Sequence, residues 1–141
     1  MPRAQCSCGK ISATVTGEPT GVVVCHCLAC QRRTGSPFGV GAYYLETQVE
    51  PTAGAKVFTR ATEAGGMCRN YFCPDCGSTV YWRVDKHPNK IGVAVGAFAD
   101  PHFAVPVRSV WEQAKHGWVE IDVAAKHFQQ GSVAEPDGGT R

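Results

Sequence analysis

The chain has 141 residues, with Lys+Arg 14 against Asp+Glu 12, so its formal net charge is +2. This length suits one domain, and a hydrophobic fraction of 43% with 18% charged residues excludes wholesale disorder. The weak positive charge gives no reason to expect nucleic acid as the main partner. No run of about 18 apolar residues is present, so no membrane span is expected.

Short strands dominate the predicted secondary structure, because Gly 16 and Pro 9 favour turns. Residues 31–37 predict one helical turn that ends at Gly35, and residues 110–118 fit either a strand or a short helix. We expect one mostly-β domain over residues 1–128 and a flexible tail over residues 129–141. Alternating or apolar runs predict strands at residues 11–15, 22–24, 38–45, 56–59, 67–72, 79–84, 91–95 and 104–107, the last confined to an edge or a bend by Pro106.

The eight cysteines fall mostly into tight local clusters. The N-terminus has no apolar signal core, so we expect a cytoplasmic protein whose thiols stay reduced. Disulfides that staple a fold join distant loops, whereas cysteines two or three residues apart direct two thiolates at one ion. Metal binding is therefore favoured over disulfides. The cysteines are Cys6, Cys8, Cys25, Cys27, Cys30, Cys68, Cys73 and Cys76.

The outer clusters predict a closed structural zinc site. Cys73-Pro74-Asp75-Cys76-Gly77 has the form of a zinc knuckle, in which proline stiffens the turn and glycine lets backbone amides approach the second sulfur. A knuckle supplies two ligands, and Cys6-Ser7-Cys8-Gly9 can supply the other two. Iron is the main rival to zinc. Either metal would clip the N-terminus to a distant segment and so stabilise the fold.

The middle cluster, Cys25-His26-Cys27-Leu28-Ala29-Cys30, brings three thiolates within six residues. Three protein ligands leave a fourth position for water or substrate, as in catalytic zinc sites. The alternative is a second closed site, with Cys68 or His26 as the fourth ligand. Strand alternation points His26 away from Cys25 and Cys27, so we expect it behind the ligands or on the surface. Cys68 is otherwise a small buried hydrophobe or an oxidation-sensitive thiol.

Together the clusters resemble the glutathione-dependent formaldehyde-activating family, which includes the centromere protein V group. The match extends from Cys6 to about Trp118. The resemblance implies an Mss4-like fold of small coiled β-sheets built around zinc. The motifs that carry it are Cys6-Ser7-Cys8-Gly9, Cys25-His26-Cys27-Leu28-Ala29-Cys30, Arg33-Thr34-Gly35-Ser36 and Phe72-Cys73-Pro74-Asp75-Cys76-Gly77-Ser78.

The resemblance also implies two zinc sites and a carbon–sulfur lyase activity. In the family the outer cysteines hold a structural zinc, here Cys6, Cys8, Cys73 and Cys76. The middle three, here Cys25, Cys27 and Cys30, hold the catalytic zinc. The family's reaction joins formaldehyde to glutathione as S-hydroxymethylglutathione, so glutathione is the expected co-substrate. Three thiolates weaken the Lewis acidity of zinc, so we favour a site that binds and delivers a thiol or exchanges one of its own thiolates.

Residues that recognise the substrate are harder to identify from sequence. Arg32 and Arg33 are the candidates for binding the glutathione carboxylates, because guanidinium pairs well with carboxylate. Arg69 and Arg83 are weaker candidates. A non-catalytic zinc-stabilised thiol carrier or interaction module remains the alternative function, and the near-neutral charge disfavours a zinc-ribbon nucleic-acid binder. We expect Trp82, Trp111 and Trp118 in the core or at its rim, and His87, His102, His116 and His127 on the surface.

Overall fold

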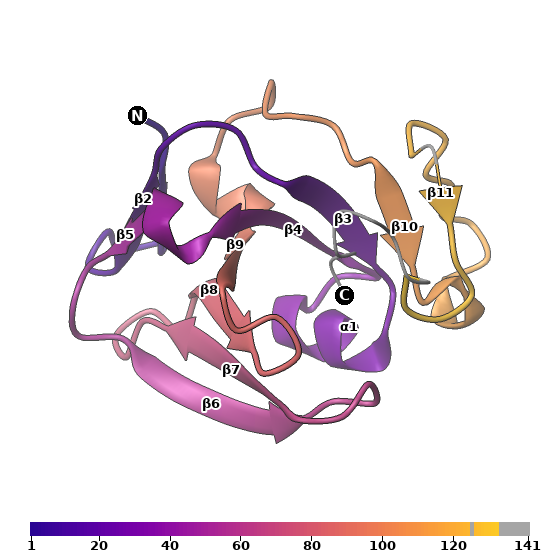
Figure 1. Cartoon of the computed structure of the whole chain (residues 1–141), viewed down its shortest axis with the longest axis horizontal. Helices are drawn as coiled ribbons and strands as arrows, with labels where there is room; N and C mark the ends of the chain where they lie inside the picture. Colours follow the sequence, from indigo (N-terminus) through magenta and orange to yellow (C-terminus); the bar gives the residue numbers. More distant parts are fainter. Residues whose placement is uncertain (125, 133–141) are drawn as a thin grey trace.

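The protein is described from a computed structural model that defines residues 1–124 and 126–132. Strands account for 38% of the chain and helices for 13%, so the predicted mostly-β fold is confirmed. Two sheets are present in the described residues, and the larger one curls around the α-helix α1 (Figure 1). None of the described helices is long and apolar enough to cross a membrane.

The large sheet has the strand order β11-β10-β3-β4-β9-β8-β7-β6, and β10 runs parallel to both β3 and β11 while the other pairs are antiparallel. The small sheet has the order β1-β2-β5, with antiparallel pairs. The bounds are β1 (Arg3–Gln5), β2 (Ser12–Val15), β3 (Gly21–Cys25), β4 (Gly39–Leu45), β5 (Val49–Pro51), β6 (Lys56–Ala61), β7 (Met67–Phe72), β8 (Thr79–Val84), β9 (Lys90–Ala94), β10 (Arg108–Val110) and β11 (Lys126–His127).

The predicted strands coincide with β2, β3, β4, β6, β7, β8 and β9, but the strand predicted at residues 104–107 is wrong. The chain joins the sheet only after Pro106, which has no N–H to donate: Val107 N–H bonds to Val22 O at 2.9 Å, and β10 follows. Residues 110–118 contain the end of β10 and the 3-10 helix η3 (Glu112–Ala114).

Alternate residues on the central strands face two different cores. Val22 and Ala42 pack with the small sheet in the first core. Val23, Cys25 and Tyr43 pack in the second core, together with Cys27 and Cys30 at the start of α1 (Leu28–Thr34). The large sheet therefore separates the core that contains Cys6 and Cys73 from the core that contains the middle cysteines.

The local sequence fixes both ends of α1. Cys27 is the N-cap residue, and its sulfur accepts a hydrogen bond from Cys30 N–H at 3.4 Å. Gly35 ends the helix in the left-handed conformation at φ 71°, and its N–H bonds to Gln31 O at 2.8 Å. The predicted end at Gly35 is thus confirmed, but the helix begins at Leu28, before the predicted range of residues 31–37. Figure 1 shows α1 inside the curve of the large sheet.

The predicted tail at residues 129–141 lies mostly outside the described residues, because residues 133–141 are not described. Within its first part, Gln129 O and Gln130 O accept hydrogen bonds from the backbone N–H groups of Gln113 and Trp111, at 3.2 and 2.9 Å.

Candidate metal centres and the cavity beside them

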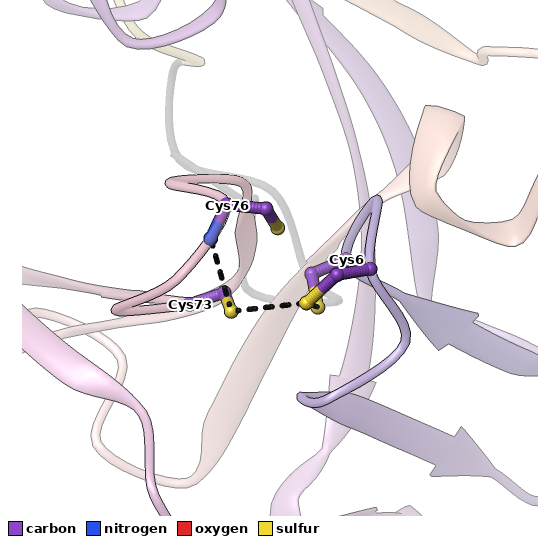
Figure 2. A group of neighbouring side chains, drawn as sticks. Cys6, Cys73 and Cys76 are labelled. Carbon is purple, nitrogen blue, oxygen red and sulfur yellow. Dashed lines mark hydrogen bonds between the residues drawn. The ribbon is translucent and has the colours of Figure 1, made fainter.

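The sulfurs of the four outer cysteines lie close together as predicted, although more than sixty residues of sequence separate the two pairs. Cys6 and Cys8 lie in the loop between β1 and β2, and Cys73 and Cys76 lie between β7 and β8. All four sulfurs lie within 4.8 Å of one another. Figure 2 shows the loop of Cys6 facing the one that carries Cys73 and Cys76.

The separations between these sulfurs fit a tetrahedral metal site. Cys8 Sγ lies 3.7 Å from Cys6 Sγ and 3.6 Å from Cys73 Sγ. A tetrahedron with zinc–sulfur bonds of about 2.3 Å has sulfur–sulfur edges of about 3.8 Å. Backbone amides also point at the sulfurs: Ile11 N–H donates to Cys6 Sγ at 3.2 Å, and Asp75 N–H donates to Cys73 Sγ at 3.4 Å. The residues therefore fit a closed structural metal site.

Electrostatics lead to the same conclusion. Hydrogen bonds from the side chain and backbone of Ser78 lower the pKa of Cys76 to about 5. The backbone of Lys10 acts to lower the pKa of Cys8, but Cys73 and burial outweigh it and raise that pKa to about 12. Adjacent thiols cannot all ionise unless a cation balances their charge. The donor set is thus suited to a divalent ion.

Two further contacts join the loops of the outer site. Ser7 Oγ lies 3.0 Å from Ser78 Oγ, and Lys10 Nζ lies 3.1 Å from Asp75 Oδ2. Both contacts are exposed and each contributes little on its own. Their role is to align the two loops while the sulfurs supply the ligands.

The middle trio, Cys25, Cys27 and Cys30, also converges, and its sulfurs lie within 4.8 Å of one another. Cys25 ends β3, Cys27 caps α1, and Cys30 lies in the first turn of the helix. Among the described residues neither Cys68 nor His26 joins this ligand group. The trio therefore offers a divalent ion three sulfur ligands and leaves a fourth position open.

His26 is fully buried, on the side away from the trio. Its backbone N–H donates to Val110 O at 3.1 Å, and its Nε2 lies 2.9 Å from Ser109 Oγ. Gln31 Nε2 reinforces this attachment by donating to His26 O at 2.9 Å and to Ala114 O at 3.1 Å. Hydrogen bonds of His26 and Gln31 thus connect the segment that carries the trio to β10 and η3.

A small cavity of about 20 Å³ borders the trio, and Cys25, Cys30 and Cys68 all line it. Cys68 is buried, as predicted for a small hydrophobe. A wider groove of about 510 Å³ adjoins it, and Arg33 and Gly39 line both spaces. Ligand pockets commonly have volumes of about 300–1,000 Å³, so the groove has room for a small peptide-sized molecule.

The two arginines predicted to bind substrate have different surroundings. Arg33 lies over the ring of Trp82, with its guanidinium carbon 4.3 Å from the ring centroid. Arg32 is exposed and lines neither space. Arg69 and Arg83 form ion pairs with Asp85 and Glu46.

The other aromatic candidates are spread between core and surface. Trp82 is 6% exposed, Trp111 is half-buried, and Trp118 is 73% exposed. His116 Nε2 lies 3.1 Å from Gln31 Oε1, and His127 Nδ1 lies 2.6 Å from Glu112 Oε2, both at exposed positions.

Sequence reasoning missed Arg60 and Asn70, which line the cavity from β6 and β7. It also missed the glycines that make room for Trp82. A Cβ atom on Gly92 would lie 2.2 Å from the indole Nε1, and one on Gly41 would lie 2.6 Å from the indole Cζ2. Gly41 in β4 and Gly92 in β9 could have indicated this packing from sequence, because a glycine inside a strand often marks a site where another group packs closely against the backbone.

Comparisons with known proteins agree with this geometry. The family model described as glutathione-dependent formaldehyde-activating enzyme matches residues 1–114. A Penicillium rubens protein, provisionally named a glutathione-dependent formaldehyde-activating enzyme, is 26% identical over 132 residues, covering 88% of this chain and 69% of that protein. A Rhodobacter sphaeroides crystal structure shares the fold, with a TM-score of 0.55 and 17% identity, over 89% of this chain and 98% of that one. The chain belongs to the glutathione-dependent formaldehyde-activating family.

Proposed function

We propose that this protein is a zinc-dependent carbon–sulfur lyase that joins a small thiol, such as glutathione, to formaldehyde and catalyses the reverse cleavage. One observation carries the proposal: three sulfurs converge beside a cavity, and no fourth ligand joins them among the described residues. Family membership and the relative's name support glutathione and formaldehyde as reactants. The clustering of reduced cysteines supports the cytoplasm as its site of action.

The proposed reaction forms one carbon–sulfur bond. The thiol sulfur adds to the carbonyl carbon of formaldehyde, the π electrons move to the oxygen, and the proton lost by the thiol ends on that oxygen. Zinc held by Cys25, Cys27 and Cys30 would favour the thiolate form of the sulfur. The outer ion, held by Cys6, Cys8, Cys73 and Cys76, would be structural.

The remaining parts of the site suit the two reactants. The groove of about 510 Å³ has room for the body of a tripeptide thiol, and the cavity of about 20 Å³ admits only a group of a few atoms. Arg33 borders both spaces and offers guanidinium N–H groups to an oxygen in either of them.

Exchange spectroscopy by NMR tests this proposal. Wild-type protein should accelerate interconversion of glutathione plus formaldehyde with S-hydroxymethylglutathione above the spontaneous rate, and Cys27→Ser should abolish the acceleration. Thr47→Ala, an exposed change on the 3-10 helix η1 (Glu46–Gln48), should behave as wild type. Glutathione binding without any acceleration would instead support the non-catalytic thiol carrier.

A further inference from the structure

The cavity beside the trio is lined by positively charged side chains and by no carboxylate among the described residues. Arg33, Arg60 and Asn70 line it, and Arg60 Nη1 also donates to Ala61 O at 3.4 Å. Its remaining walls are formed by Cys25, Cys30 and Cys68, together with apolar and aromatic residues. Groups that donate hydrogen bonds to an anion therefore face the space next to the sulfur ligands.

The sheet register explains how Arg60 reaches this cavity. Arg60 on β6 is paired with Cys68 on β7, which in turn is paired with Val84 on β8. Directly paired residues point to the same face of a sheet, so Arg60 shares a face with Cys68. Asn70 lies two residues further along β7 and points the same way. Arg60 thus lies beside Cys68 and borders the same cavity as Cys30, although 30 residues of sequence separate Arg60 from Cys30.

Arg33 reaches the cavity from the opposite side, in the last turn of α1. Its guanidinium rests on Trp82, and Trp82 Nε1 donates to Tyr43 Oη at 3.1 Å. Gly39 leaves the necessary space, because a Cβ atom there would lie 2.5 Å from Arg33 Nη2. The position of Arg33 is therefore built into the second core.

Neither guanidinium has a carboxylate partner within the described part of the chain. Carboxylates elsewhere in it pair with Lys10, Arg69 and Arg83. Both Arg33 and Arg60 are half-buried, which makes an unneutralised charge more costly than at the surface. Three thiolates with a divalent ion carry one net negative charge, and two guanidiniums leave one positive charge over. A reactant that brings one further negative charge, on its sulfur or on a carboxylate, makes the site neutral.

We infer that this cavity is an anion subsite of the proposed reaction, taking a carboxylate carried by one of the two reactants. The inference rests on the proposed function and narrows its substrate class. A water molecule needs about 10–15 Å³, so a cavity of about 20 Å³ has room for a water-sized group such as a carboxylate oxygen and not for the body of a tripeptide. The carboxylate must lie within a few bonds of the reacting atom. Mercaptoacetate as the thiol and glyoxylate as the aldehyde have this form.

Direct binding gives the first test. In a Trp111→Phe/Trp118→Phe variant the only tryptophan is Trp82, whose ring contacts Arg33. Acetate, mercaptoacetate and glyoxylate should change its fluorescence on binding to the metal-loaded protein. Arg33→Gln and Arg60→Gln should each weaken that binding about tenfold. Lys56→Gln, on β6 but outside the cavity, is the matched control. Equal carboxylate binding by all these variants would overturn the inference.

Exchange kinetics then distinguish the two sources of the carboxylate. If the aldehyde carries it, Arg60→Gln should lower kcat/KM about tenfold for glyoxylate with 2-mercaptoethanol, and by clearly less for formaldehyde with the same thiol. If the thiol carries it, the loss should appear with mercaptoacetate and formaldehyde instead. If both substrate pairs are exchanged and Arg60→Gln keeps the wild-type kcat/KM for each of them, the subsite is rejected and the proposed function is kept. Carboxylate binding without exchange for any pair would reject the proposed function and keep the subsite.

Discussion

His26 Nε2 lies 2.9 Å from Ser109 Oγ, in a fully buried contact between residues 83 positions apart. The contact links the residue between two trio cysteines to the central strand pair β3–β10. Burial also lowers the pKa of His26, which favours the neutral imidazole. The cysteine segment is therefore anchored from the face opposite its sulfurs.

Ser109→Ala should remove this anchor. It leaves a buried imidazole nitrogen without its partner, which costs about 1–3 kcal/mol of unfolding free energy. We also expect weaker binding of the ion in the middle site, because Cys25 and Cys27 are no longer held in register. Denaturant unfolding and a competitive chelator titration measure the two effects. The outer site is the internal control, and an equal loss from both sites would show general destabilisation.

The outer and middle sites should lose metal independently. Cys73→Ser and Cys8→Ser remove a buried and an exposed outer ligand, and each should lower the bound metal by one equivalent. Loss of that ion should also lower the unfolding free energy by more than about 3 kcal/mol, because it closes a long loop. Elemental analysis and thermal melts measure these changes.

Cys68→Ala is the control for the outer-site variants and should keep both ions, since Cys68 belongs to neither ligand group. Loss of an ion from this variant would show that Cys68 is a ligand and that the middle site is closed.

Gly92→Ala should disturb the support of Arg33. The new Cβ atom would lie 2.2 Å from Trp82 Nε1, so the indole must move away from Tyr43 and Arg33. Overpacking of this kind costs about 1–3 kcal/mol. Gly117→Ala meets nothing within 4 Å and is the matched control. Urea midpoints and Trp82 fluorescence provide the measurements, and equal stability of the two variants would contradict the glycine argument.

Asp85 should give one acid-dependent contribution to stability. Its hydrogen bonds with the Arg69 side chain and the Met67 backbone lower the pKa of this carboxyl below its ordinary value. A carboxyl with a lowered pKa binds fewer protons when folded, so its contribution is complete above pH of about 4 and disappears as the pH falls through the folded pKa. Asp85→Asn should therefore lower stability at pH 7.

The stability difference between wild type and Asp85→Asn should vanish in strong acid. Urea midpoints between pH 2 and pH 7 test the trend, with the exposed Asp122→Asn as a control. A difference that stays constant across this range would show that the Asp85 charge is not responsible.

Much of the fold was predictable because local patterns determined it. The strands predicted at residues 67–72 and 79–84 have the same bounds as β7 and β8. Gly35 marks the end of α1 because it adopts the left-handed backbone conformation. The clustering of Cys73 with Cys76 likewise predicts a shared ligand role before any geometry is known. Such features depend on neighbours within a few residues.

The parts that sequence could not reveal depend on distant pairing. The short strand β11 has two residues and exists because β10 offers it a parallel edge. Arg60 faces the cavity only because its register with Cys68 sets which face it occupies. A shift of one residue would have turned its side chain to the other face. The hydroxyl of Ser109 likewise gains importance only when β10 lies beside β3.

The linkage of Cys6 and Cys8 to Cys73 and Cys76 also imposes an order on biosynthesis. The ribosome makes the middle trio long before Cys73 and Cys76 exist, so the first sulfurs available to a metal are those of the N-terminal pair and the trio. A nascent chain therefore passes through a stage in which every possible four-sulfur combination is non-native. If both proposed ions bind, the timing of metal delivery, in addition to ligand geometry, would decide whether each ion reaches its own site.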